Sequence, residues 1–417
     1  RAHPRGPPRA STRVMSSVSA SFAPKIAPSS APRRKMSSQT TQRAAILSKS
    51  SSTPAPPAVV STNTFAEANE AELLRACELF APGSSFALSP TSGGVNNHVR
   101  YCDCDDGSRF VVRLYNNGQN TNRVAFEHAV LTAVGPHVLG NDYGFVVPKA
   151  LKAKSGNGST FAILPSGDAA SVFALIPGAL PKTKFAEAVG EATAELSYCL
   201  QLAEGEVRSQ FQQSPQHQYR NIFGSLVDKG GSKESFYHEM ETNPGLQGAV
   251  KPAVLNLANM IRDVERQLVI IENSGGLPET LLHGDVHYDN TLCDLSTGRV
   301  TGIIDFEFAV FDWRFMEAAV GLSKYVGEPN PLPFVVEYLS GFMRRADWVT
   351  DKEIEWLPTL IKLRVLETVV YFVARAVSGE DDISQLALRA ENYAKRVTWI
   401  EDNAVAIRTA ARDGAKR

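Results

Sequence analysis

Residues 281–310 constrain the fold of this 417-residue chain more than any other stretch, and they read LLHGDVHYDNTLCDLSTGRVTGIIDFEFAV. Two apolar runs in this stretch each end at an acidic residue, Asp285 and Asp305, and Asn290 lies between them. A polar turn at 296–298 separates two strand-like segments, which is the pattern of a β-hairpin between two polar loops. Since a hairpin brings its ends together, we expect Asn290 and Asp305 to lie close in space.

This arrangement of oxygen-bearing side chains suits phosphoryl transfer from ATP. An Asn290 oxygen beside an Asp305 carboxylate forms a site of hard ligands, which is the kind of site that Mg²⁺ prefers. Asp285 is left beside the metal, where it can accept a proton from a hydroxyl. In such a site the metal neutralises phosphate charge and the carboxylate orients the attacking oxygen. The alternative is that these residues only serve the turns of their loops.

The stretch resembles the catalytic and metal loops of the aminoglycoside-phosphotransferase-like small-molecule kinases, which are distant relatives of protein kinases. His283-Gly284-Asp285 stands where protein kinases have His-Arg-Asp, and Asn290 stands at their loop Asn. Asp305-Phe306-Glu307 matches their Asp-Phe-Gly. His287 falls where protein kinases carry a phosphate-contacting Lys, so it is either a phosphate contact or a packing residue. We expect His283 to be structural.

The resemblance implies an α+β, bilobal, protein-kinase-like fold, with a small N-terminal antiparallel-sheet lobe and a larger, mostly helical C-terminal lobe. We predict a nucleotide-binding lobe at 65–178 and a catalytic and acceptor-binding lobe at 179–417. Apolar residues at helical spacing predict helices at 65–80, 122–134, 184–202, 254–273, 334–343, 354–377 and 383–411. Strands are predicted at 97–102, 109–115, 145–148, 160–164, 172–176, 291–295 and 300–304. Residues 205–248 are expected to be an insertion with short helices.

Two features of the small lobe are candidates for nucleotide binding. Ser92, Gly93 and Gly94 precede the first predicted strand, and adjacent glycines let backbone N–H groups approach a phosphate, although such pairs also mark simple turns. Arg113 lies in an apolar strand and needs a partner, for which Glu127 in the next helix is placed. The pair resembles the Lys–Glu pair of kinases, with Arg at the strand position as in choline kinases. The alternative is a structural surface ion pair.

Charge is distributed unevenly along the chain. Residues 1–64 contain ten Lys or Arg and no acid, so removing them changes the formal net charge from −1 to −11 (−1 minus 10). The acidic remainder argues against a nucleic-acid or anionic-membrane partner. The Arg-, Ser- and Ala-rich segment 1–64 is typical of a disordered transit peptide, with Met15 a plausible start, and favours the plastid (chloroplast) stroma. The alternatives are a mitochondrion, the cytoplasm, or a plain disordered tail.

Cysteine usage and hydropathy restrict the class of protein further. The five cysteines are odd in number and form no Cys-x-x-Cys pair, so we expect reduced thiols. No run approaches the roughly 18–20 apolar residues needed to span a bilayer. The longest candidate, 365–377, is interrupted by Glu367 and Arg375 and is expected to be a buried helix rather than a membrane anchor.

Several residues after the metal loop are candidates for supporting roles. The resemblance puts Glu317 where the family has an Asp that supports the catalytic loop, and the change to Glu leaves open whether it still caps that loop. Asp312 is expected to be the better structural acid. Five aromatic residues either line an acceptor pocket or, as is more common, belong to the core: Trp313, Tyr325, Trp356, Tyr371 and Trp399.

Taken together, the resemblance implies an ATP- and Mg²⁺-dependent phosphotransferase that acts on a hydroxyl of a small metabolite. Asp285 would be catalytic, Asn290 and Asp305 would bind the metal, and GIIDFEFAVFD is most similar to homoserine-kinase-like members. Amino-alcohol, choline or ethanolamine, and aminoglycoside acceptors remain alternatives, as does a kinase-shaped protein without catalytic activity. A protein kinase is disfavoured, because no Arg precedes Asp285 and no Ala-Pro-Glu follows Asp305.

Overall fold

The structure is a computed structural model that describes residues 62–81, 83, 85–91, 97–116, 120–156 and 158–416, with side chains from Glu70 onward. The described residues all belong to one compact unit. Two expectations fall outside the described residues: nearly all of the transit-peptide segment 1–64, and the glycine loop Ser92-Gly93-Gly94.

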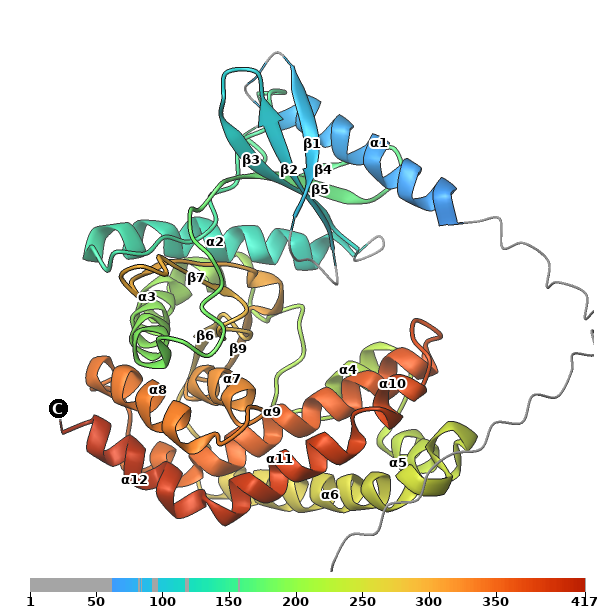
Figure 1. Ribbon diagram of the computed structural model, residues 1–417, viewed down its shortest axis with the longest axis vertical. Coiled ribbons are helices and arrows are strands. Elements are labelled where there is room, and N and C mark those ends of the chain that lie inside the picture. The colour runs from blue at the N-terminus through green and yellow to red at the C-terminus, as the bar shows by residue number, and fades with distance from the viewer. Residues whose placement is uncertain are drawn as a thin grey trace, which may run out of the picture. The chain divides into compact units, whose positions relative to one another are not determined.

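A five-stranded antiparallel sheet in the order β1-β2-β3-β5-β4 forms the small lobe (Figure 1). Its strands are β1 (Phe86–Pro90), β2 (His98–Cys104), β3 (Arg109–Leu114), β4 (Ala162–Ile163) and β5 (Ala169–Ala174). Helix α1 (Thr62–Phe80) packs its apolar face on the sheet, where Cys77 and Phe80 are buried with Cys102 and Val112. Helix α2 (Thr121–Asn141) follows β3 and extends beyond the range predicted for it. The strand predicted at 145–148 is wrong, since only Val146 forms an isolated bridge there.

Helices dominate the large lobe. They are α3 (Ala186–Gln210), α4 (Gly224–Asp228), α5 (Lys233–Thr242), α6 (Lys251–Asn273), α7 (Met316–Tyr325), α8 (Leu332–Arg345), α9 (Asp351–Val377), α10 (Ser384–Ala387), α11 (Ala390–Asp402) and α12 (Ala404–Gly414), with single 3-10 turns at Pro244–Leu246, Gly248–Val250 and Phe306–Phe308. The long helices α6, α8 and α9 match their predictions, whereas α3 continues to Gln210, beyond its predicted end at 202. The rest of 205–248 holds short helices as expected. The single helix predicted at 383–411 is divided into three.

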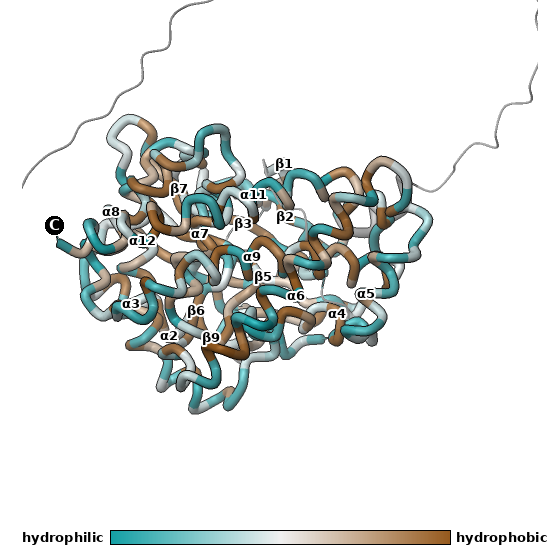
Figure 2. The backbone as a smooth tube through the Cα atoms, turned by 90° about the horizontal axis from the view of Figure 1, so that it is seen from below, coloured by the Kyte–Doolittle hydropathy of each residue, from teal (hydrophilic) through white to brown (hydrophobic). Residues whose placement is uncertain are grey.

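The long helices bury one face each, as their sequence spacing predicts. Helix α6 buries residues spaced three or four apart: Val254, Leu257, Ala258, Ile261, Val264, Leu268 and Ile271. Apolar and polar positions alternate along the tube of α6 in Figure 2. Helix α9 begins at a capping box, in which Thr350 and Glu353 each accept the other's backbone N–H, and it then passes through the core.

Two short antiparallel ladders position the candidate loops. The predicted hairpin pairs β7 (Thr291–Cys293) with β8 (Val300–Ile303). A second ladder, which the sequence did not indicate, pairs β6 (Glu279–Leu282) with β9 (Val310–Trp313). The loop 283–290 follows β6 and the loop 304–309 follows β8. The two ladders therefore hold both loops side by side.

The connection between the lobes is attached to this hairpin. Thr301 in β8 donates its hydroxyl to the carbonyl oxygen of Pro177 over 2.6 Å, and Ala179 forms a bridge with Cys293. Gly178 has a φ of +144°, and a Cβ there would lie 2.4 Å from the Thr301 oxygen, so only glycine fits this position. The chain thus enters the large lobe along the strands that carry the candidate metal residues.

The cysteine prediction is confirmed, since all five are buried free thiols. Within the described ranges, no helix is both long and apolar enough to cross a membrane. The segment 365–377, which was predicted to be a buried helix, forms the C-terminal half of α9, and the prediction is confirmed.

Candidate active site

Glu317 holds the backbone of the loop that carries Asp285. Its two carboxylate oxygens accept the N–H groups of His283 at 2.6 Å and Gly284 at 3.1 Å. Burial raises the pKa of Glu317 to about 7, although both backbone hydrogen bonds oppose this shift. The sequence left open whether a Glu at this position caps the loop, and the structure shows that it does.

Asp312 is structural, as expected, but it acts on the loop only through a second residue. It is fully buried and accepts the backbone N–H groups of Tyr219 and Trp313, and burial raises its pKa to about 6. The Tyr219 hydroxyl in turn donates to the carbonyl oxygen of Gly284. Glu317 rather than Asp312 is therefore the acid that holds the loop directly, which corrects our preference for Asp312.

His283 is a structural residue, as the sequence predicted. Its Nδ1 accepts the N–H of Asp285 at 3.1 Å, which leaves Nε2 to donate to the carbonyl oxygen of Ile304 at 3.0 Å. Burial lowers the pKa of His283 to about 4, so the ring is neutral and links the two loops. Gly284 has a φ of +80°, and a Cβ there would lie 2.2 Å from the carbonyl oxygen of Phe308. The loop can take this path only with glycine.

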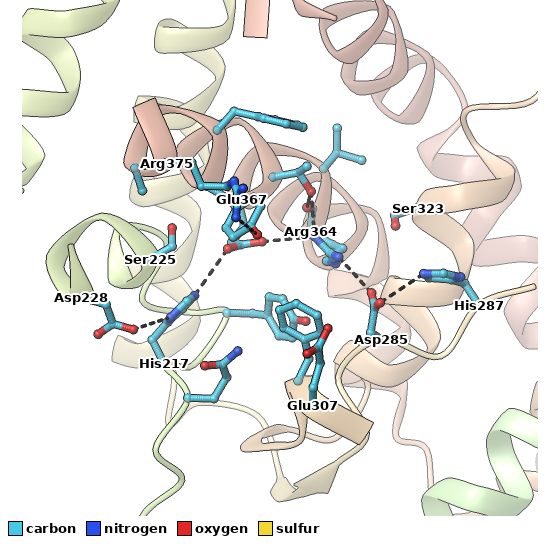
Figure 3. A pocket seen from close by; sticks show the side chains of 18 of the residues that line it. His217, Ser225, Asp228, Asp285, His287, Glu307, Ser323, Arg364, Glu367 and Arg375 are labelled. Atoms are coloured by element: carbon cyan, nitrogen blue, oxygen red, sulfur yellow. Dashed lines mark hydrogen bonds and ion pairs between the residues drawn. The ribbon is translucent and has the colours of Figure 1, made fainter. Parts of the chain in front are cut away.

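The Asp285 carboxylate is held by three side chains. Its Oδ1 accepts Arg364 at 3.1 Å, and its Oδ2 faces His287 Nε2 at 3.3 Å (Figure 3). Its Oδ2 also accepts the Asn290 amide at 3.0 Å. Burial raises the pKa of Asp285, but His287, Arg364 and Lys324 together lower it well below its usual range. Asp285 is therefore ionised at neutral pH.

His287 serves Asp285 in this structure. The ring is 5% exposed, and its Nδ1 accepts the N–H of Asp289 at 3.2 Å. This hydrogen bond leaves the proton on Nε2, the nitrogen that faces the Asp285 carboxylate. The two readings of His287 from sequence, phosphate contact and packing, did not include this arrangement.

The hairpin places Asn290 and Asp305 at the same end of the β7–β8 ladder. The N–H of Ile304 donates to the carbonyl oxygen of Asn290 at 2.9 Å, next to the paired residues Thr291 and Ile303. The amide nitrogen of Asn290 is taken up by Asp285, so its Oδ1 is the atom available to a cation. The residues that the sequence pattern singled out therefore come from two adjoining loops.

The predicted partners Arg113 and Glu127 form a buried pair rather than a surface one. Arg113 is 8% exposed and donates to Glu127 at 2.9 Å, to Asp305 at 3.0 Å and to Glu307 at 3.1 Å. Burial raises the pKa of Glu127 to about 7 against the opposing effect of the Arg113 charge. One guanidinium thus joins the small-lobe strand β3 to the loop that carries Asp305.

The donor atoms at this loop fit a magnesium ion. Over the part of the chain that the structure describes, no three His, Cys, Asp or Glu side chains converge into a ready-made metal site. Mg²⁺ commonly takes only one or two protein ligands and fills its other positions with water and substrate phosphates. Asn290 Oδ1 and the Asp305 carboxylate, whose side chain is 36% exposed, supply two such hard oxygens.

Sequence reasoning missed a chain of alternating charges that leads away from Asp285. Arg364 donates to Glu367 at 3.1 Å, and Glu367 faces His217 at 3.4 Å (Figure 3). His217 contacts Asp228 at 3.3 Å, and Asp228 accepts Arg123 of the small-lobe helix α2 at 3.0 Å. The sequence did contain a signal for this network, because charged residues within an apolar helix need partners. We considered Glu367 and Arg375 only as interruptions of the apolar segment 365–377.

A cavity of about 1090 Å³ opens between the two lobes at Asp285. Of the five aromatic residues considered from sequence, only Tyr371 lines it. Trp313 and Tyr325 are fully buried in the core, and Trp356 packs against the core. Trp399 lines a separate hollow of about 560 Å³ between α6 and α11. The core reading was therefore correct for most of these residues.

The chain is similar in sequence to a known protein family and in fold to solved kinase structures. A model of the phosphotransferase enzyme family matches residues 87–353. No curated protein sequence matches the chain. The structure is similar to that of a microcompartment-associated aminopropanol kinase, with 18% identity and a TM-score of 0.59 over 82% of this chain and 98% of that one.

Two antibiotic kinases show the same likeness. An aminoglycoside 2'-phosphotransferase-IIIa in complex with GDP has 14% identity and a TM-score of 0.54 over 79% of this chain and 98% of that one. An amicoumacin kinase in complex with AMP-PNP and Ca²⁺ has 13% identity and a TM-score of 0.54 over 80% of this chain and 96% of that one. At such identities the likeness is one of fold, and it confirms the predicted bilobal, protein-kinase-like architecture.

Proposed function

This chain belongs to the phosphotransferase enzyme family, and from that premise we propose that it transfers the γ-phosphoryl group of ATP to a hydroxyl of a small metabolite. The observation that carries the proposal is the placement of three residues on two adjoining loops: Asp285 lines the inter-lobe cavity, Asn290 donates to its carboxylate, and Asp305 follows the strand paired with the one after Asn290. Phosphoryl transfer needs little covalent chemistry from a protein and depends on positioning and charge.

Asp285 would receive the acceptor hydroxyl. Its carboxylate is ionised and is fixed by Arg364, His287 and Asn290, so one orientation is set before a substrate binds. It would accept a hydrogen bond from the hydroxyl and take its proton as the new O–P bond forms, while the bond from the γ-phosphorus to the β-phosphate oxygen breaks and ADP leaves. A positioned base of this kind typically contributes about 10²–10⁴ in rate.

The phosphates would lie toward Asn290, Asp305 and Arg113. Asn290 and Asp305 would hold Mg²⁺, which when bound neutralises charge on the phosphate oxygens. Arg113 keeps its charge in every state and is oriented by Glu127, so it is placed to contact a phosphate near Asp305. A phosphate contact by His287, and cover by the backbone of Ser92, Gly93 and Gly94, remain part of the proposal.

Among acceptors, we propose a homoserine-like or amino-alcohol compound. The resemblance of GIIDFEFAVFD to homoserine-kinase-like sequences and the fold likeness to an aminopropanol kinase support this choice over choline, ethanolamine or aminoglycosides. The alternative to an enzyme is that the chain has a kinase-like fold but no catalytic activity. The presence of all five residues named for the reaction argues against it: Arg113, Glu127, Asp285, Asn290 and Asp305.

A coupled ADP-release assay with Mg·ATP against homoserine, amino alcohols, choline and sugars tests the proposal. Asp285→Asn should bind ATP as the wild type does but lose transfer by about 10²-fold or more. Asp294→Asn, at a partly exposed acid in the hairpin turn, is the matched control and should retain activity. Wild-type turnover in Asp285→Asn would show that the assigned role is wrong.

The metal assignment needs a separate measurement. Asp305→Ala should weaken binding of Mg·ATP much more than binding of ATP in EDTA, because it removes a ligand of the ion. Titration of both forms by calorimetry would reveal this difference. Equal affinities for wild type and variant in the presence of Mg²⁺ would exclude Asp305 as a ligand.

The destination of the protein is also a proposal. The composition of 1–64, with ten basic and no acidic residues, supports import into a plastid. A fusion of 1–64 to a fluorescent protein should enter plastids and be shortened there. Accumulation in mitochondria or in the cytoplasm would contradict the plastid assignment.

A further inference from the structure

The cavity beside Asp285 is balanced in charge rather than acidic. Six Lys or Arg side chains line it together with six Asp or Glu side chains: Arg123, Lys229, Lys324, Arg364, Arg375 and Arg396 against Glu127, Asp228, Asp285, Glu307, Glu367 and Glu380. An acidic cavity would select a cationic acceptor on charge alone, and this cavity does not have that character.

Most of these cations already have a carboxylate partner. Arg123 pairs with Asp228, Arg364 with Asp285 and Glu367, Lys324 with Asp289, and Lys229 and Arg375 with Glu380. Arg396 of α11 is the exception: among the residues that the structure describes, no carboxylate forms an ion pair with it. Since arginine does not lose its proton, this charge faces the cavity without a counter-ion.

The surroundings of Arg396 hold its guanidinium in place without a counter-charge. Its Nε is buried without a hydrogen-bond partner. The guanidinium carbon lies 5.6 Å from the Tyr393 ring centroid, and a Cβ at Gly327 would come within 2.3 Å of it. Glu328, which follows Gly327 in the chain, accepts the Tyr288 hydroxyl at 2.6 Å. The group is therefore fixed by packing and not by a salt bridge.

A continuous wall joins Arg396 to the candidate reaction centre. Gly327, which packs on Arg396, donates its N–H to the carbonyl oxygen of Lys324 at 2.9 Å. The Lys324 charge is close enough to Asp285 to lower the pKa of that carboxyl. Ser323 and His287 lie on the same side of Asp285 in Figure 3, and both line the cavity. Asp285 and Arg396 thus line the same cavity, in which one bound molecule would meet both.

We propose that Arg396 binds a carboxylate of the acceptor, so that the preferred substrate is a hydroxylated carboxylic acid rather than an amino alcohol. The inference rests on the proposed function, because it places the reacting hydroxyl at Asp285. The planar fork of an arginine matches the two oxygens of a carboxylate, and this geometry selects against a neutral or cationic group. The acceptor would then be read at two points, by its hydroxyl at one end and by its negative charge at the other.

Matched acceptor pairs that differ only by a carboxylate test this inference. They are homoserine with 3-aminopropan-1-ol, threonine with 1-aminopropan-2-ol, and serine with ethanolamine, and glycerol 3-phosphate with glycerol separates a phosphate from a carboxylate. The wild type should have the lower KM for the carboxylated member of an amino-acid pair. Arg396→Gln should raise that KM by about 10- to 100-fold, the usual effect of losing a charge-assisted pair, with little change in kcat.

Three comparisons separate recognition from mere stability. Arg396→Gln should leave the KM of the decarboxylated member unchanged, since that compound has no group for Arg396. Arg396→Lys should recover part of the preference, because it keeps the charge and loses the fork. Lys395→Gln on the same helix, whose side chain is 77% exposed, is the matched control and should behave as the wild type.

A binding measurement makes the test independent of turnover. Thermal shifts of the full chain with each compound, in the presence of Mg·AMP-PNP, should show stronger stabilisation of the wild type than of Arg396→Gln by carboxylated compounds only. If no compound is phosphorylated, the proposed function fails for this panel while the binding arm still judges Arg396. Equal losses for both members of each pair, a preference confined to glycerol 3-phosphate, or no difference between wild type and Arg396→Gln in either arm would overturn the inference.

Discussion

Arg364 of helix α9 donates through its guanidinium to Oδ1 of Asp285 over 3.1 Å, although 79 residues separate them in the chain. This contact, together with burial, which opposes it, and the nearby His287, sets the low pKa of Asp285. The cation keeps the carboxylate ionised and also fixes its orientation.

Replacing Arg364 should therefore change the pH dependence of the reaction. Loss of the cation raises the pKa of Asp285, so Arg364→Gln should lose activity at a higher pH than the wild type as the solution is acidified. The acid limb of the profile of kcat/KM against pH is the measurement. Arg408→Gln on α12, which pairs with the exposed Glu355, is the control. Superimposable acid limbs for Arg364→Gln and wild type would contradict the assignment.

Removing Arg113 should destabilise the protein as well as weaken nucleotide binding. Arg113→Met would leave Glu127 buried near Asp305 and Glu307 without a counter-charge, and such losses cost about 3–5 kcal/mol of unfolding free energy. Urea unfolding measures this difference. Arg113→Met combined with Glu127→Gln should recover part of the loss, because the buried charge is also removed. Strict additivity of the two single changes would show that the residues are not coupled.

The length of the Glu317 side chain should matter for the catalytic loop. Glu317→Asp shortens the side chain by one methylene, so its carboxylate should no longer reach the N–H groups of both His283 and Gly284. An unsatisfied buried N–H costs about 1–3 kcal/mol. We expect faster amide exchange at 283–284 and a lower kcat, whereas Glu337→Asp at an exposed position of α8 should change neither. Unchanged exchange would mean that Glu317 does not hold the loop.

His217 should make stability depend on pH in the alkaline range. Burial lowers the pKa of His217, but the contacts with Asp228 and Glu367 outweigh burial. The pKa is therefore raised to about 9, compared with 6.5 for the ordinary side chain. The stabilisation is fully present below pH 6.5 and is lost as the pH rises through about 9.

The variant His217→Gln measures this effect directly. At pH 6 its unfolding free energy should be lower than that of the wild type, by at most roughly 3 kcal/mol. The two proteins should converge near pH 10, and His238→Gln, at an exposed position of α5, should follow the wild type throughout. A constant difference between His217→Gln and wild type across this range would show that protonation of His217 is not involved.

Local spacing accounts for the parts of the site that could be predicted from sequence. The hairpin between Asn290 and Asp305, and the pairing of Arg113 with Glu127, each lie within about fifteen residues along the chain. The resemblance to small-molecule kinases predicted the two-lobed architecture. Neither the local spacing nor the resemblance depends on how distant helices pack.

The missed contacts arise from packing between distant segments. Glu367 meets His217 across 150 residues, and β6 pairs with β9 rather than with a neighbour in sequence. No spacing rule specifies such partners. The buried charges of α9 could still have been recognised as a site, since the argument that gave Arg113 a partner applies equally to Arg364 and Glu367.

The tie between Thr301 and Pro177 has a consequence for how such a molecule could open and close. This hydrogen bond attaches the connection between the lobes to the β7–β8 ladder, which ends next to Asp305. The hinge for a movement of the sheet relative to the helices must therefore lie before Pro177. Asp305 and Asn290 would then stay still with the helices while Arg113 travels with the sheet. Superposing open and closed forms on the β7–β8 ladder should therefore reveal the movement as a change in the separation of Arg113 from Asp305.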